Sequence, residues 1–142
     1  PPFRELWERY PIDALEESFA AGDMEWEGRV VSAHHKLARL EARMREGDRS
    51  ETELWKRYDW EFHQALISAC GSKVLMDTHA GVFDKYLRYQ MIALSFRGDI
   101  AAEEHRIMHE AALARDATTA REVLKRHVEG GVEHALATGS IK

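Results

Sequence analysis

The sequence predicts an all-α protein, an antiparallel bundle of about six helices. Apolar residues recur every three or four positions over most of the chain, and glycines and helix-capping residues divide it into segments of helical length. No stretch of alternating β-branched and polar residues is long enough for a strand. With 142 residues, 44% of them hydrophobic, the chain can bury one core, so we treat residues 1–142 as a single domain.

A proline and a glycine separate the first predicted helices. Residues 3–21 favour helix, but Pro11 removes a backbone donor, so we expect a break there or a short helix followed by another. After Gly22, Asp23 is a suitable N-cap for a helix that runs to about Glu46. The core-facing stripe of that helix consists of Trp26, Val30, Ala33, Leu37, Leu40 and Met44.

Capping residues also mark the later helices. The sequence from Ser50 to Glu53 has the form of a capping box, in which both side chains satisfy backbone amides, and it predicts a helix over residues 51–69. Short connections favour antiparallel neighbours. The remaining helices are predicted from a cap at Ser72 to a stop at Gly98, from Asp99 to about Arg115, and from residues 116–119 to about Thr138.

Composition excludes several classes of protein. The formal net charge is −5 and the isoelectric point is near 5.9, which argues against nucleic-acid binding by this chain itself, because phosphate contacts need a concentrated basic surface. No apolar run approaches the length of a membrane span, and the first residues do not open a signal peptide. The single cysteine, Cys70, cannot form an intramolecular disulfide. We therefore expect a cytoplasmic protein without membrane contact.

Two residues of the helix predicted over residues 51–69 have a chelating spacing. Asp59 and His63 are four residues apart on one predicted helix, so their side chains project from the same face. Such a pair is often an ordinary surface hydrogen bond. Asp59, however, lies beside Tyr58 and Phe62 at the border of the apolar stripe, where an unpaired carboxylate is costly to bury.

Two further histidines occupy inward positions on the last two helices. His105 and His127 each lie in the apolar stripe of their helix, so three helices direct an imidazole or a carboxylate into one interior. Any one of these residues could be a core histidine bonded to a backbone carbonyl. One divalent transition metal would accommodate all four together, and Zn, Ni, Mn and Fe are not distinguished by ligands of mixed hardness. The bundle is thus expected to hold a metal or ligand site in its core.

A cation in an aromatic-rich segment is the best candidate for a second ligand contact. Arg88 could pair with an anionic ligand, and Tyr86 and Gln90 on the same helix are candidate ligand-binding residues beside it. The alternative for Arg88 is an exposed salt bridge with Asp84, four residues earlier. His79 could line a cavity. His109 could be a ligand together with His105, could contact a ligand from outside, or could be a surface residue.

The sequence resembles one known family in three segments. They are Asp59-Trp-Glu-Phe-His63-Gln-Ala-Leu-Ile-Ser-Ala-Cys-Gly71, then Ala102-Glu-Glu-His105-Arg-Ile107, then Ala120-Arg-Glu-Val-Leu-Lys-Arg-His127. They are similar to the C-terminal effector-binding domain (FCD type) of FadR-like GntR-family bacterial transcription regulators. In metal-containing members these positions bind the ion, which implies Asp59, His63, His105 and His127. Pro11 departs from the family pattern, because relatives have a continuous first helix there.

The resemblance implies a domain that senses a ligand and forms a homodimer. The family places a winged helix-turn-helix before this domain, and this chain has no such segment, so DNA would be bound only through a domain not present here. Leu6, Trp7 and Trp26 offer apolar surface for dimerisation. A divalent ion with one Asp and three neutral His ligands keeps a local charge of about +1, which favours a small organic carboxylate as effector.

Two other functions remain open at this point. A metal-dependent enzyme acting on a small carboxylate is one, since a site with open coordination positions can activate water. Glu61 and Glu104 are adjacent to ligands in sequence but are expected to point to different faces of their helices, so no general base is evident and we expect no enzymatic activity. A purely structural helical dimerisation module is the other.

Overall fold

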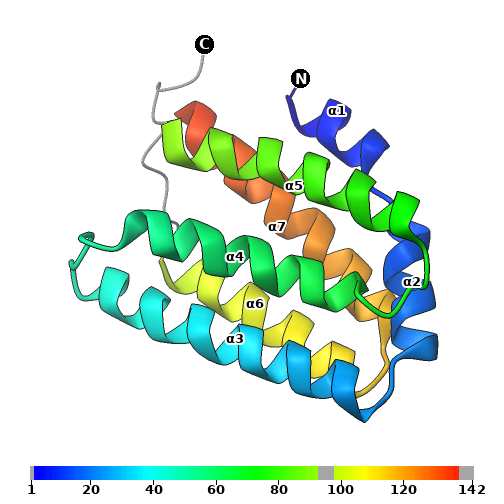
Figure 1. The fold of residues 1–142 in the computed structure, drawn as a ribbon. Helices are drawn as coiled ribbons and strands as arrows, with labels where there is room; N and C mark the ends of the chain where they lie inside the picture. The colour runs from blue at the N-terminus through cyan, green and yellow to red at the C-terminus, as the bar shows by residue number, and fades with distance from the viewer. Residues whose placement is uncertain (1, 93–97, 138–142) are drawn as a thin grey trace.

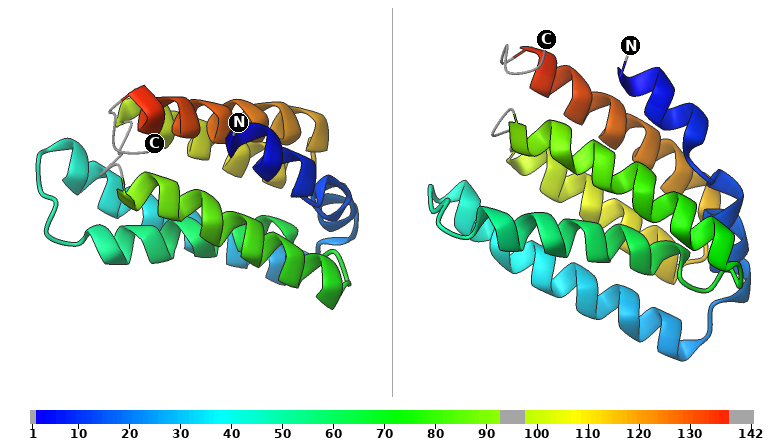
Figure 2. Two further views of the ribbon diagram at one scale, coloured as in Figure 1. Left: turned by 90° about the horizontal axis from the view of Figure 1, so that it is seen from above. Right: turned by 45° about the horizontal axis from the view of Figure 1, so that its top comes forward.

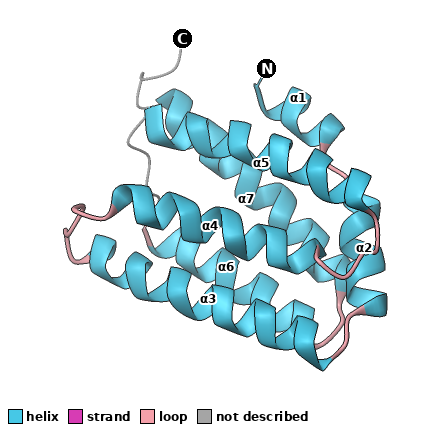
Figure 3. Ribbon diagram, in the orientation of Figure 1, coloured by secondary structure: helices cyan, strands magenta, loops and turns pink. Residues whose placement is uncertain are grey.

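The computed structural model describes residues 2–92 and 98–137, and in this part of the chain it contains seven α-helices and no strand (Figures 1 and 3). The predicted fold class is therefore confirmed. The additional helix arises at Pro11, where the first predicted segment divides in two. The helices are α1 (Pro2–Arg9), α2 (Ile12–Ala21), α3 (Met24–Arg45), α4 (Thr52–Ile67), α5 (Lys73–Ile92), α6 (Asp99–Leu113) and α7 (Ala117–Ala137).

Five helices form a closed ring. Going round it, α3 packs on α4, α4 on α5, α5 on α7, α7 on α6, and α6 again on α3. Helices that follow one another through short turns, such as α3 and α4 or α6 and α7, run in opposite directions (Figures 1 and 2). Helix α2 packs on α4 and α7, and α1 packs on α5 and α7. The interior of this ring is where inward-facing side chains of all five helices meet.

Aromatic residues fill the part of the core beneath α2. Trp26 is fully buried, packs against Phe19 and donates its indole N–H to the carbonyl oxygen of Ala65 at 3.0 Å. The Arg115 guanidinium lies over the Trp26 ring and donates to the backbone carbonyls of Phe19 and Gly22. Trp26 thus belongs to the core stripe, and the expectation that it offers dimerisation surface was wrong because α2 and Arg115 cover it.

The predicted helix caps are partly confirmed. Asp23 accepts a hydrogen bond from the backbone N–H of Trp26 at 2.9 Å, and Ser72 accepts one from the backbone N–H of Leu75 at 3.2 Å, as N-caps do. The capping box at Ser50 was wrong: α4 begins at Thr52, and the Ser50 hydroxyl instead donates to Asp48 in the preceding turn. The Ser50 hydroxyl and backbone N–H both donate to Oδ1 of Asp48, which holds Ser50 in the turn before the helix begins.

None of the helices in the described part of the chain combines the length and the apolar character needed to cross a membrane.

Candidate metal centre

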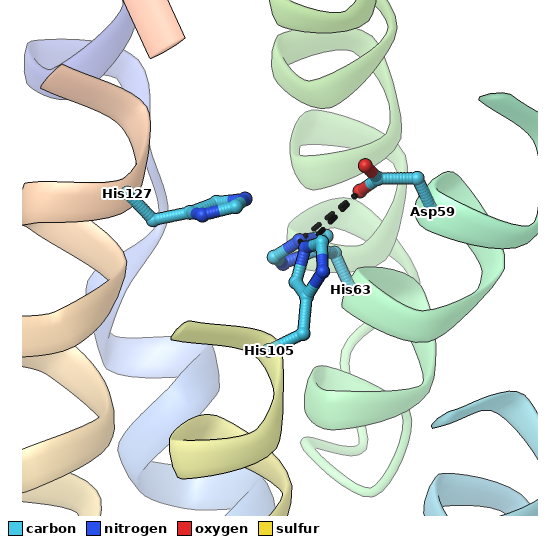
Figure 4. Close-up of side chains that lie close together, drawn as sticks. All are labelled: Asp59, His63, His105 and His127. Atoms are coloured by element: carbon cyan, nitrogen blue, oxygen red, sulfur yellow. Dashed lines mark hydrogen bonds and ion pairs between the residues drawn. The ribbon is translucent and has the colours of Figure 1, made fainter. Parts of the chain in front are cut away.

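Four side chains from three helices converge in the middle of the ring. Helix α4 supplies Asp59 and His63, α6 supplies His105, and α7 supplies His127 (Figure 4). Each of the four is at most 1% exposed. One potential ligand atom from each residue lies within 4.8 Å of the others. The structure therefore brings together all four residues that the sequence identified.

The shortest distances within this cluster are close to those between ligands of one ion. Nε2 of His63 lies 3.2 Å from Oδ1 of Asp59 and 3.2 Å from Nε2 of His105, and the latter two atoms are 3.7 Å apart. Two ligand atoms that each lie about 2.1 Å from an ion, on neighbouring coordination positions, are roughly 3.0–3.4 Å apart. Three of the ligand atoms therefore lie at or near the spacing of neighbouring positions on one ion, and the fourth, on His127, lies within 4.8 Å of them. By their convergence and their donor types, the residues present fit a divalent metal ion.

Two carboxylates outside the cluster orient its histidines. Glu41 of α3 accepts a hydrogen bond from Nδ1 of His105 at 3.0 Å, and Glu104 of α6 accepts one from Nδ1 of His127 at 3.1 Å. With Nδ1 protonated, each ring presents the lone pair of Nε2 to the cluster, which is the arrangement seen around metal-bound histidines. Nε2 of His63 and Nε2 of His105 lie 3.2 Å apart, which is hydrogen-bond distance when one of the two nitrogens carries a proton.

Sequence reasoning missed the role of both carboxylates. Glu104 was expected to point away from the site, yet it is buried against His127. It precedes the inward residue His105 on α6, and a residue next to an inward position lies at the edge of the buried face. Glu41 was not identified at all. Its signal was an ionisable residue beside Leu40, in the core stripe of α3. Glu61 does lie on the outside, within ion-pair distance of Lys36 and Arg57.

Helix α5 closes the site with aromatic rings. The Phe83 ring stacks on His63 with the two ring centres 4.0 Å apart. The Tyr86 hydroxyl donates to the backbone carbonyl of His127 at 3.3 Å. Tyr86, a predicted ligand contact, is therefore buried beside the cluster. These rings exclude water from one side of the site, which strengthens electrostatic interactions inside it.

The other predicted ligand contacts are placed differently. Arg88 is exposed and lies 3.2 Å from Asp84, the alternative that its spacing left open, so the structure does not bring Arg88 to the cluster. Gln90 belongs to the last turns of α5, but its side chain is outside what the structure describes.

Two other histidines, His79 and His109, lie outside the four-residue cluster. His79 is buried, with Nδ1 at 2.7 Å from Oε1 of Gln64 and Nε2 at 3.0 Å from the Tyr10 hydroxyl. One N–H and one lone pair satisfy both contacts, so His79 is a neutral core histidine. His109 stacks on His34 with ring centres 4.3 Å apart and stands outside the four-residue cluster.

Burial and neighbouring charges set the proton affinity of the cluster. Burial raises the pKa of Asp59 above 3.8, lowers the pKa of His63 well below 6.5, and lowers the pKa of His127 to about 3. For His105, burial alone would lower the pKa, but the charges of Glu41 and Asp59 outweigh it and raise the pKa above 6.5. These directions favour a proton on His105, which a metal ion bound at Nε2 would have to displace.

Without metal, the domain is expected to lose stability as the pH falls from 7 to 5. The pKa values of His63, His79 and His127 lie below 6.5 in the folded state, His79 and His127 at about 3, because these residues are buried. The unfolded chain therefore takes up protons below pH 6.5 that the folded chain refuses. His34, whose pKa is lowered to about 4 mainly by burial, adds to this effect, whereas the raised pKa values of His105 and Asp59 oppose it. More groups have a lowered pKa than a raised one, so the net loss is on the order of 1–3 kcal/mol per pH unit below 6.5.

Urea unfolding at several pH values in the presence of a chelator measures this dependence. A His79→Gln variant is the control, because it removes one contributing group without touching the cluster and should show a shallower slope. A free energy of unfolding that increases as the pH is lowered from 7 to 5 would contradict the conclusion that these histidines are buried in the neutral form.

Comparison with known proteins identifies the family. Residues 13–130 match the family model described as the FCD domain. The chain belongs to this family. The resemblance to the FCD domain of GntR-family regulators, noted from its sequence motifs, is thereby confirmed.

The curated relatives of this FCD domain are transcription regulators. It is 34% identical over 132 residues to the uncharacterized HTH-type transcriptional regulator BphR of Paraburkholderia xenovorans, covering 92% of this chain and 54% of the relative. It is 33% identical over 120 residues to the HTH-type transcriptional repressor GlaR of Escherichia coli, covering 78% of this chain and 52% of the relative. The FCD domain thus spans about half the length of these relatives. No solved structure gave a significant match.

Proposed function

We propose that this FCD domain is the ligand-sensing part of a bacterial transcription regulator. In this proposal Asp59, His63, His105 and His127 bind one divalent transition metal, and a small organic carboxylate binds at the metal and modulates DNA binding by an attached domain. The observation that carries the proposal is the buried Asp/His cluster inside a domain whose relatives are named as regulators. Those names also give indirect support to a role other than catalysis.

The chemistry of the ligand set supports a metal that can take a further ligand. Four protein ligands leave coordination positions free on any ion that prefers five or six, such as Mn, Fe or Ni. When bound, the ion would act as a Lewis acid that accepts an oxygen of the effector. The chain's own residues would orient the imidazoles and exclude water: Glu41 and Glu104 through Nδ1 hydrogen bonds, and Phe83 by stacking.

The structure changes the charge argument for the effector. The sequence count of about +1 included only the ion and Asp59, whereas Glu41 and Glu104 add two buried carboxylates around the same site. The site as a whole therefore carries no positive excess when both carboxylates are ionised. A carboxylate effector is supported by direct coordination to the ion, where the attraction is strongest, and not by the net charge of the surroundings.

A thermal-shift screen of organic acids tests the proposal. Small mono- and dicarboxylates are expected to stabilise the metal-loaded domain by mass action, by about 2.7 kcal/mol at one hundred times the dissociation constant. The same acids should have little effect after treatment with a chelator. Amides of the same acids are the matched controls, since they lack the coordinating anion. Equal stabilisation of the metal-loaded and chelated domain would show that coordination is not the binding mode.

We also propose that the domain forms a homodimer. Helix-turn-helix regulators commonly bind paired DNA half-sites as dimers, and the described surface carries exposed apolar side chains at Met24, Val74 and Ile100. Sedimentation velocity at micromolar concentration should give a single species of twice the 16.3 kDa chain mass. A monomer across the concentration range would contradict this prediction.

A further inference from the structure

An open groove runs along the outside of the ring, between α3 and α6. It has a volume of about 690 Å³, within the range typical of small-molecule sites. Small side chains at Ala38 and Ala102 leave the space, and Ile100 and Ile107 give it apolar walls. Glu41 and Glu104, the carboxylates that hold His105 and His127, also line it. The groove therefore lies behind the metal cluster and is separated from it by these two side chains.

Glu41, one of the residues that line the groove, has a buried carboxylate oxygen without a donor. Glu41 is 1% exposed, and its Oε2 accepts from His105, but its Oε1 has no hydrogen-bond partner in the described part of the chain. An unsatisfied buried carboxylate oxygen is costly, and a ligand that supplies an N–H donor would relieve that cost. The chemistry at this end of the groove thus calls for an ammonium group.

Among the cationic side chains that line the groove in the described part of the chain, one has no ion-pair partner. Arg45 pairs with Asp99 at 3.0 Å, and Arg106 pairs with Glu103 and Glu110. Arg126 of α7 also lines the groove and has no ion-pair partner among the residues that the structure describes. An unpaired guanidinium is suited to bind a carboxylate.

We propose that this groove is a second ligand site, for a small amino acid with an aliphatic side chain. Its ammonium group donates to the Glu41 carboxylate, its carboxylate binds Arg126, and its side chain packs on Ile100 and Ile107. The site is distinct from the open positions at the metal, and only its link to the metal rests on the proposed function. Because Glu41 holds His105, occupancy of the groove changes metal affinity, and metal changes amino-acid affinity by the same factor.

Calorimetric titration of the metal-loaded domain with leucine tests the proposal. Two comparison compounds each lack one charged group: 4-methylpentanoate has no ammonium, and 3-methylbutylamine has no carboxylate. Leucine should bind about tenfold or more tightly than either, the effect expected of one charged hydrogen bond. Failure of leucine to bind would overturn the proposal.

Variants locate the binding. Arg126→Gln should weaken leucine binding about tenfold or more, whereas Lys125→Gln, an exposed cation on the same helix outside the groove, should not change it. Ala102→Leu fills the groove and should abolish binding. Leucine affinity that is unchanged in both Arg126→Gln and Ala102→Leu would place the ligand elsewhere and overturn the proposal.

The outcome separates this inference from the proposed function. If 4-methylpentanoate binds as tightly as leucine and both are lost on chelation, the carboxylate binds at the metal and the groove proposal fails while the proposed function stands. If leucine binds in the groove but carboxylates do not bind at the metal, the groove proposal stands and the proposed function fails. The coupling itself is read as a change in metal dissociation constant with saturating leucine, expected at about fivefold or more.

Discussion

Chelation of the metal-loaded domain is expected to lower its melting temperature by about 10 °C or more. A ligand present at a thousand times its dissociation constant contributes about 4 kcal/mol, and a domain of this size loses roughly 3–4 °C per kcal/mol. Elemental analysis should give one ion per chain before treatment. A His105→Ala/His127→Ala double variant should purify without metal and melt at a lower temperature that no longer responds to chelator.

Two further variants separate metal binding from general packing. His35 is exposed on α3, so His35→Ala should keep both the ion and the melting temperature. Asp59→Asn should abolish metal binding yet stabilise the metal-free domain, because burial raises the pKa of Asp59 and the neutral amide avoids that penalty. A double histidine variant with full metal content and unchanged stability would refute the assignment.

A Glu41→Gln substitution is expected to weaken metal binding by about 10- to 100-fold, although Glu41 is not itself a proposed ligand. The carboxylate holds Nδ1–H of His105 at 3.0 Å and adds negative charge beside the cation. The amide keeps an acceptor but removes the charge. Competition with a chelator of known affinity measures the change. Glu104→Gln should act in the same direction through His127, which it contacts at 3.1 Å.

The neighbouring Glu103 provides the matched control for these variants. It lies next to Glu104 on α6 but is exposed and pairs with Arg106, so Glu103→Gln should leave metal affinity unchanged. The pKa of His105 gives a second measurement. In the metal-free Glu41→Gln variant it should fall, because the charge of Glu41 raises it against the effect of burial. Unaltered metal affinity in both Glu41→Gln and Glu104→Gln would remove these residues from the site.

Local signals accounted for most of the fold. Periodicity located α3, capping residues located the starts of α3 and α5, and Pro11 located the division between α1 and α2. The capping box at Ser50 was wrong because the pattern of residue types does not show that Asp48 accepts hydrogen bonds from Ser50 and holds it in the preceding turn. The closed order of five helices is a property of long-range packing that no local pattern contains.

The candidate site divides in the same way. The four cluster residues could be found because periodicity places them on or beside inward helical faces, and Asp59 and His63 also have a chelating spacing. Glu41 could not, since its meaning depends on α3 packing beside α6. Arg88 was a candidate by residue type, but only the packing of α5 shows that its side chain points to solvent.

The three helices that hold the cluster have a consequence for the lifetime of the folded state. Asp59 and His63 lie on α4, whereas His127 joins them only when α7, the last helix, has docked against α5 and α6. An ion held by all four side chains would tie together helices that are far apart in sequence, through contacts that we expect to form late in folding. Interactions absent from the folding transition state slow unfolding and leave the folding rate nearly unchanged. Bound metal would therefore slow unfolding and lengthen the time between spontaneous openings of the ring.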